Sequence, residues 1–324
     1  METNTPVETI RESIQEYATP VSIVIAGIAI AVSMYAIQTE RPADVVSDAG
    51  AQVRLEESVM PASGVVLPVV WSDLGARLVE SGAIDADKLR QMYESRGTWN
   101  KEYERLLAGR ENGKLTITRE NSGYLLNLLW AFGLANKNPI LEDSSEMMNP
   151  GYGGAGNFAS TGGWTVAKGN AMEHYNMHAL VELTPEQQAL VDRVSRNIYR
   201  PCCGNSTHFP DCNHGMAMLG FLELMASQGV GEEDMYKAAL AVNSYWFPDT
   251  YLTMAEYMQN KGINWKRVSP QEMLGANYSS AAGFRNILSQ VGVTSNGGSG
   301  SGCGVEAGGG TIAPTPRQQS GCSI

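Results

Sequence analysis

Residues Tyr124–Leu134, with the sequence YLLNLLWAFGL, place apolar side chains on nearly every face of a helix. A helix that is apolar all round is covered by its neighbours on all sides. This stretch therefore predicts a central buried helix. On both sides of it, apolar residues recur at intervals of three and four, which is the period of an amphipathic helix. We expect a mostly α-helical protein.

Further helices are marked by their periodicity and by their end signals. The sequences TPEQ at 184–187 and SPQE at 269–272 are capping boxes, which begin helices. The periodic segments are Trp71–Ser81, Asp85–Glu94, Trp99–Leu107, Met216–Ser227, Glu232–Tyr245 and Tyr251–Asn260. Extended chain is expected only at 64–70 and 114–118. The sequence predicts one helical globular domain over residues 64–290, with little strand.

The chain ends differ from this domain in composition. Residues 21–37 are uncharged and apolar, at the short end of what crosses a bilayer, and we expect a single N-terminal transmembrane helix there. A cleaved signal peptide fits less well, because residues 1–20 are acidic rather than basic. A buried soluble helix is the other alternative. Residues 38–63 are expected as a stalk. Residues 291–324 are expected as a disordered Gly/Ser-rich tail that is free to meet a protein partner.

This organisation predicts a single-pass membrane protein whose bulk lies outside the cytoplasm. The chain carries 23 basic and 34 acidic residues, a net charge of −11. Nucleic acids and anionic lipid surfaces attract cationic faces, so neither is an expected partner. The glycine-rich stretch 149–163 contains a G-x-G-x-x-G pattern, but no strand precedes it, and dinucleotide binding is not expected. No hydrolase or nucleotide motif is present, so the sequence indicates no reaction and no catalytic residue.

The segment 201–214, PCCGNSTHFPDCNH, concentrates metal-binding side chains. It holds three of the five cysteines and two of the four histidines. The other two histidines lie upstream at i and i+4, a spacing that predicts one helix face. Thiolate and imidazole groups hold zinc, copper and iron. The candidate metal ligands are therefore Cys202, Cys203, His208, Cys212, His214, His174 and His178.

The expected cofactor is a transition metal ion, with zinc preferred to copper. Cys202 and Cys203 are adjacent, so both reach one ion only if the turn at Gly204 folds them together. Four nearby methionines (Met172, Met177, Met216 and Met218) favour copper(I), although methionine at helical spacing usually fills a core. Two alternatives stay open: a structural or interaction module with buried or disulfide-bonded cysteines, and a thiol-disulfide redox protein.

About thirty residues, 198–228, carry a local resemblance. The Pro201–Gly204 sequence, followed by His208, Cys212 and His214-Gly215, resembles bacterial membrane-attached proteins named for a Pro-Cys-Tyr-Cys-Gly-Cys motif. This chain has adjacent rather than alternating cysteines and lacks the lipid-attachment cysteine of that family. The resemblance implies an exported protein with a cysteine/histidine site and implies no activity.

Overall fold

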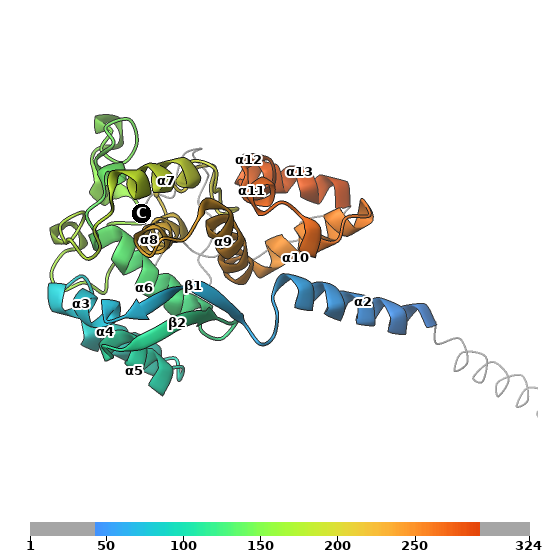
Figure 1. Cartoon of the computed structure of the whole chain (residues 1–324), viewed down its shortest axis with the longest axis horizontal. Helices are drawn as coiled ribbons and strands as arrows, with labels where there is room; N and C mark the ends of the chain where they lie inside the picture. The colour runs from blue at the N-terminus through green and yellow to red at the C-terminus, as the bar shows by residue number, and fades with distance from the viewer. Residues whose placement is uncertain (1–42, 292–324) are drawn as a thin grey trace, which may run out of the picture. The chain divides into compact units, whose positions relative to one another are not determined.

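The computed structural model describes residues 43–291, and their fold is mostly helical, as expected (Figure 1). Its α-helices are α2 (Ala43–Val59), α3 (Leu74–Ser81), α4 (Ala86–Glu94), α5 (Lys101–Ala108), α6 (Ser122–Ala135), α7 (Pro185–Ser195), α8 (Asn213–Ser227), α9 (Glu232–Trp246), α10 (Pro248–Asn260), α11 (Pro270–Leu274), α12 (Ala276–Ser279) and α13 (Ala281–Val291). The strands β1 (Val65–Ser72) and β2 (Asn112–Ile117) form one antiparallel sheet.

The chain divides into two units at Arg54. The described part of the first unit is residues 43–54, which belong to α2. The described part of the second unit is residues 55–291 and contains every other element. Helix α2 thus occupies most of the segment expected as a stalk. Its sequence lacks an apolar stripe, but Ala, Gln, Arg, Leu and Glu have high helix propensity.

The core of the second unit is built on α6 and α8, which approach at backbone contact. A Cβ atom on Gly133 would lie 2.1 Å from the carbonyl oxygen of Met216, and one on Gly220 would lie 2.7 Å from that of Leu129. Helix α6 is the predicted central helix, and its residues from Tyr124 onward are buried. Helix α8 is buried from its first residue, so the chemistry at its start is held in the core.

Several predicted helix ends are confirmed, and one helix begins later than expected. The capping box at 184–187 is present with both of its hydrogen bonds. Helix α3 begins at Leu74, whereas the periodicity placed its start at Trp71. Trp71 instead belongs to β1, where its indole N–H donates to the carbonyl oxygen of Leu106 at 2.7 Å. Ser72, at φ 51°, then ends the strand.

The segment between α6 and α7, residues 136–184, contains only short 3-10 turns, at Pro139–Glu142, Pro150–Tyr152, Ala155–Asn157 and Ala171–Glu173. The prediction that His174 and His178 share a helix face is therefore wrong. Asparagine side chains stabilise these turns locally, as where Asn170 accepts from the Met172 amide. Asn176, at φ 58°, turns the chain between the two histidines, so no helix forms.

Within residues 43–291, no helix combines the length and the apolar character needed to cross a bilayer. The predicted anchor at 21–37 lies outside the described residues. So does the tail from residue 292 onward, with Cys303 and Cys322.

Candidate metal centre

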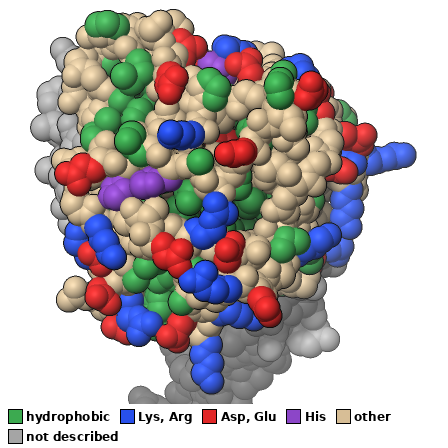
Figure 2. All heavy atoms as spheres, turned by 60° about the vertical axis from the view of Figure 1, so that its left-hand side comes forward, with side chains coloured by type: hydrophobic (Ala, Val, Ile, Leu, Met, Phe, Trp, Pro, Cys, Tyr) green, Lys and Arg blue, Asp and Glu red, His purple; other side chains and the backbone are tan. Residues whose placement is uncertain are grey.

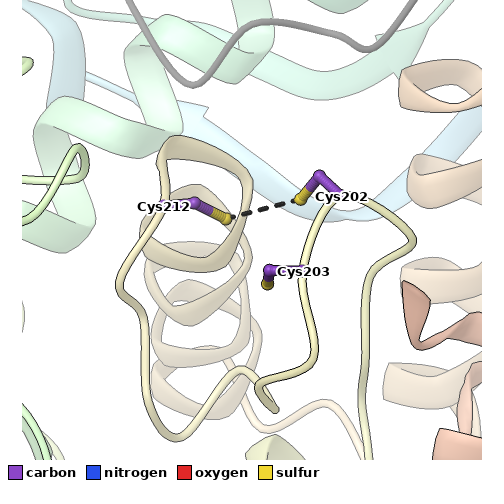
Figure 3. A group of neighbouring side chains, drawn as sticks. All are labelled: Cys202, Cys203 and Cys212. Carbon is purple, nitrogen blue, oxygen red and sulfur yellow. Dashed lines mark hydrogen bonds between the residues drawn. The ribbon is translucent and has the colours of Figure 1, made fainter. Parts of the chain in front are cut away.

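Three cysteines meet where one loop returns to the start of α8 (Figure 3). The loop leaves α7, and a β-bridge between Tyr199 and Ser206 closes its neck. Cys202 and Cys203 lie in the turn beyond that neck, so these adjacent residues are not alternating strand positions. Cys212 is the N-cap of α8, and its sulfur accepts a hydrogen bond from the Gly215 amide at 3.4 Å.

The ligand atoms of Cys202, Cys203 and Cys212 all lie within 4.8 Å of one another. The sulfurs of Cys202 and Cys212 are 3.6 Å apart (Figure 3). Cys212 is fully buried, Cys203 is 7% exposed, and Cys202 alone is partly exposed. All three are free thiols. The turn at Gly204 therefore brings the adjacent Cys202 and Cys203 toward one site, as binding of a shared ion requires.

Arg200 is a buried cation that holds this loop together. Its guanidinium donates to the Cys212 sulfur at 2.9 Å and to Oδ1 of Asp211 at 2.5 Å. It also donates to the backbone carbonyls of Asn205 and Phe209 at 3.1 and 3.0 Å. The side chain is 2% exposed. A buried charge is tolerated only when it is paired and hydrogen-bonded, and four acceptors satisfy that condition here.

The three thiols differ in acidity. Burial by itself raises the pKa of Cys212, but contacts with Cys202 and Cys203 and the charge of Arg200 outweigh it, so the pKa falls well below its usual value. The pKa of Cys202 is raised, first by its contacts with the other two cysteines and then by burial. For Cys203, contact with Cys202 lowers the pKa, but contact with Cys212 and burial raise it to about 12. Of the three, Cys212 is the cysteine whose surroundings favour the thiolate form.

His214 lies two residues after Cys212, in the first turn of α8. Its ring is buried against the aromatic rings of Trp246 and Phe247, at centroid distances of 5.7 and 4.4 Å. Its Nδ1 atom is buried without a hydrogen-bond partner among the described residues. The ring is close enough to Cys212 to contribute to the lowering of that thiol's pKa. Of the four histidines predicted as metal ligands, His214 is therefore the one that lies beside the thiols.

His208 belongs to a different group. Its ring is buried between two carboxylates, with Nδ1 2.6 Å from Glu146 and Nε2 2.9 Å from Asp192. Burial alone would lower the pKa of His208, but the hydrogen bond and charge of Glu146, with Asp192, outweigh it and raise the pKa. Asp143 and Glu146 lie within 4.8 Å of His208. Both ring nitrogens face carboxylates, which favours a charged imidazolium that ties the loop to α7.

His174 and His178 form a third group. The Nδ1 atom of His174 lies 3.1 Å from Nε2 of His178, and the two rings are stacked. The other nitrogen of His174 is 2.7 Å from the carbonyl oxygen of Lys168. Burial lowers the pKa of His178, and the charges of His174 and Lys137 add to the effect. The seven predicted ligands are therefore distributed over three groups, and the compact thiol group contains only the cysteines.

Two buried charged residues that bear on the site were not predicted as such. Arg200 lies two residues before Cys202, and the signal was a basic side chain directly before Pro201 in a loop with no other Lys or Arg between 197 and 212. Glu223 lies fully buried in the middle of α8, and a lone acid in an apolar helix was the signal for it.

No family model, no curated protein and no solved structure matches this chain. The resemblance over residues 198–228 therefore stays a prediction.

Proposed function

We propose that this protein binds a transition metal ion, zinc in preference to copper(I), through the thiolates of Cys202, Cys203 and Cys212. The observation that carries the proposal is the convergence of three sulfurs to within 4.8 Å of one another in a buried loop. Thiolates are soft ligands that select zinc and copper(I) over hard cations such as Mg²⁺. On binding, the ion would displace the protons that the cysteine sulfurs carry.

The spacing of the sulfurs supports this ligand set. Metal–sulfur distances of about 2.3 Å in trigonal or tetrahedral geometry separate two sulfurs by about 3.8–4.0 Å. The distance of 3.6 Å between Cys202 and Cys212 is close to that value, and no pair exceeds 4.8 Å. Side-chain movements of under about 1 Å bring all three sulfurs onto one ion.

The surroundings favour a divalent ion. Three thiolates and one divalent ion carry a net charge of −1, and the buried Arg200 guanidinium contacts both this group, through Cys212, and the Asp211 carboxyl. His214 is the candidate fourth donor, because its Nδ1 atom is buried and unpartnered among the described residues, although its ring nitrogens lie outside the group of ligand atoms within 4.8 Å of one another. A Cys₃His set is a common structural zinc site. Met216 and Met218 belong to the hydrophobic core, which weakens the case for copper made from the methionines.

Anaerobic titration of tag-free, full-length protein with Cd²⁺, a thiophilic stand-in for Zn²⁺, tests the proposal. We expect one equivalent to produce thiolate-to-metal ultraviolet absorption and Zn²⁺ to compete it away. Cys212→Ser and Cys202→Ser should each abolish the signal, because each removes one of three ligands. Cys303→Ser is the matched control, since it removes a thiol of the same chain that is not among the three proposed ligands. Equal absorption in Cys212→Ser and Cys303→Ser would end the proposal.

Cobalt(II) tests the fourth ligand. Cobalt in a Cys₃His site gives visible absorption bands whose positions depend on the donor set. His214→Ala should shift these bands while retaining three thiolate contacts, since it replaces imidazole by water. A spectrum unchanged by His214→Ala assigns the ion three sulfur ligands alone and removes His214 from the site.

Thiol-disulfide exchange is the second candidate, favoured by the 3.6 Å approach of Cys202 to the Cys212 thiolate. In that reaction the Cys212 thiolate attacks a substrate disulfide and expels one substrate thiolate. Cys202 then loses its proton and attacks the Cys212 sulfur, which releases the second thiolate. The protein ends oxidised by two electrons and the substrate reduced. Full burial of Cys212 hinders the first step, because substrate disulfides must reach the attacking sulfur.

Equilibration in glutathione redox buffers separates these two functions. Exchange predicts a Cys202–Cys212 disulfide, seen by mass spectrometry as the loss of two hydrogen atoms, at potentials where glutathione is largely reduced. Metal binding predicts that zinc protects both thiols from oxidation. A disulfide that forms equally fast with and without zinc would favour the redox function.

We further infer that residues 21–37 anchor the protein to a membrane, with the described domain outside the cytoplasm. The uncharged composition of this segment supports the inference. Deletion of residues 1–40 should move the protein from the membrane fraction to the supernatant. Unchanged fractionation would contradict it.

A further inference from the structure

We infer that His174 and His178 form a second metal site, separate from the thiol cluster, that takes a borderline divalent cation such as Ni²⁺, Zn²⁺ or Cu²⁺. The two facing nitrogens, Nδ1 of His174 and Nε2 of His178, are 3.1 Å apart. Imidazole is the protein ligand best suited to these ions. The site rests on the histidine pair alone and is independent of the function proposed for the cysteines.

The separation of the two nitrogens matches a chelate. Metal–nitrogen distances of about 2.0–2.1 Å and angles of about 90–110° at the metal place two imidazole nitrogens about 2.8–3.4 Å apart. The observed 3.1 Å lies inside that range. The rings are already stacked at an interplanar angle of 25°, so a small rotation of the half-buried His178 ring directs both lone pairs to one ion.

The surroundings of His174 orient it as a ligand. Its Nε2 atom lies 2.7 Å from the Lys168 carbonyl oxygen, which can only accept, so Nε2 carries the proton. In the neutral ring, Nδ1 is then the lone-pair nitrogen, and it faces His178. A backbone carbonyl that fixes the tautomer in this way is the usual partner of a metal-bound histidine. The His174 ring is also held in place by packing against Gly82, where a Cβ atom would lie 3.0 Å from it.

Without metal, the pair shares a proton. His178 donates from Nε2 to Nδ1 of His174, and its own Nδ1 is then the unprotonated nitrogen. When an ion binds, the His178 proton moves to Nδ1 and Nε2 becomes a ligand, so no net proton is released. Two imidazoles leave positions on the ion for water or for a donor from another molecule.

The pair lies at the edge of the fold, with His174 only 8% exposed and the His178 ring more open to solvent. Figure 2 shows histidine side chains at the molecular surface, with acidic and basic side chains around them. His208 and His214 are almost fully buried, whereas His178 is partly exposed. Met177 beside it is 57% exposed. An ion from solution can therefore reach this site without opening the fold.

Nickel titration of the tag-free, full-length protein tests the inference. Ni²⁺ prefers imidazole, whereas Cd²⁺ prefers thiolate, so the two ions report on different sites. We expect one equivalent of Ni²⁺ by calorimetry or native mass spectrometry, and a loss of roughly tenfold or more in affinity for His178→Ala. His174→Gln should lose as much, and the double variant should lose no more than either single variant. Met177→Leu is the control for a change at this surface.

The two proposals fail in different ways. His178→Ala should lose Ni²⁺ and keep the Cd²⁺–thiolate absorption, whereas Cys212→Ser should lose the absorption and keep Ni²⁺. His178 is partly exposed, so its variant is expected to fold, which circular dichroism checks. Unchanged Ni²⁺ affinity in His178→Ala overturns the histidine site. Loss of both signals in a folded His178→Ala variant shows one shared site and also overturns it. If the parent protein binds Ni²⁺ but shows no Cd²⁺–thiolate absorption, the thiol site is contradicted and the histidine site is supported.

Discussion

Replacing Glu223 by Gln should stabilise the protein at neutral pH. This side chain is fully buried in the middle of α8, and its Oε2 accepts from the Asn136 amide at 2.6 Å. Its Oε1 has no hydrogen-bond partner among the described residues. Burial raises the pKa of this carboxyl to about 8, although the hydrogen bond from Asn136 and the nearby Asn138 amide partly oppose the shift. Gln keeps the shape and an acceptor for Asn136, and it removes the ionisation.

The magnitude follows from proton linkage. Between pH 4.5, the ordinary pKa, and pH 8, the unfolded chain has released this proton and the folded chain still holds it. Stability is therefore highest below the unfolded pKa and falls as pH rises toward the folded pKa. Each pH unit is worth about 1.4 kcal/mol, so at pH 7 the loss is about 3 kcal/mol, and it levels off near 5 kcal/mol above pH 8. Glu223→Gln should recover most of this loss.

Urea unfolding of parent and Glu223→Gln at about pH 5 and about pH 8 measures the effect. The two proteins should differ by about 1 kcal/mol at the lower pH and by several kcal/mol at the higher. Glu233→Gln is the matched control, because it makes the same chemical change at a side chain that is 84% exposed on helix α9. A difference between parent and Glu223→Gln that does not change with pH would refute the reasoning.

Three further predictions concern other described residues. Arg200→Met should destabilise the fold by about 3–5 kcal/mol in chemical denaturation, because it strips a buried ion cluster of its cation. It should also raise the pKa of Cys212, measured by thiolate ultraviolet absorbance; an unchanged pKa would show that the guanidinium is only structural. Since the pKa of His208 is raised above 6.5, its stabilisation is complete below that value and lost as pH rises through the folded pKa. The unfolding free energies of parent and His208→Gln should therefore converge at alkaline pH, and a constant gap would contradict this. Gly133→Ala should cost about 1–3 kcal/mol by overpacking, whereas Gly204→Ala, in open space, should cost under about 0.5 kcal/mol, and equal thermal midpoints for the two would disprove the close helix contact.

The helices were predictable because their signals are local. Periodicity identified α6, and a Thr-Pro-Glu-Gln capping box identified the start of α7. The end of β1 was missed, because Trp71 fits a helical period as well as a strand, and only the pairing of β1 with β2, as of Ser72 with Asn112, decides between them. Such a contact joins residues far apart in the sequence, and no local pattern contains it.

The candidate site was predictable in composition but not in grouping. The density of thiols between Cys202 and Cys212 located the cluster. The assignment of His174 and His178 to a helix failed, because side-chain capping by asparagine competes with helix formation in this segment. Their rings meet nevertheless, through a turn rather than a helix. The role of Arg200 depends on the fold of the whole loop, which residue spacing alone does not determine.

The contact between Arg200 and Gly215 has a consequence for finding related proteins. A Cβ atom on residue 215 would lie 2.5 Å from the guanidinium carbon, so the arginine and a side chain at 215 exclude each other. The structural requirement translates into the spaced pattern R-x-C-C-x₈-C-x-x-G, running from Arg200 to Gly215. In genome sequences, chains that share the thiols should vary at the arginine and the glycine together. In related chains with a residue larger than glycine at the position of Gly215, we expect another residue in place of Arg200. The thiols of those chains should then have less positive charge nearby.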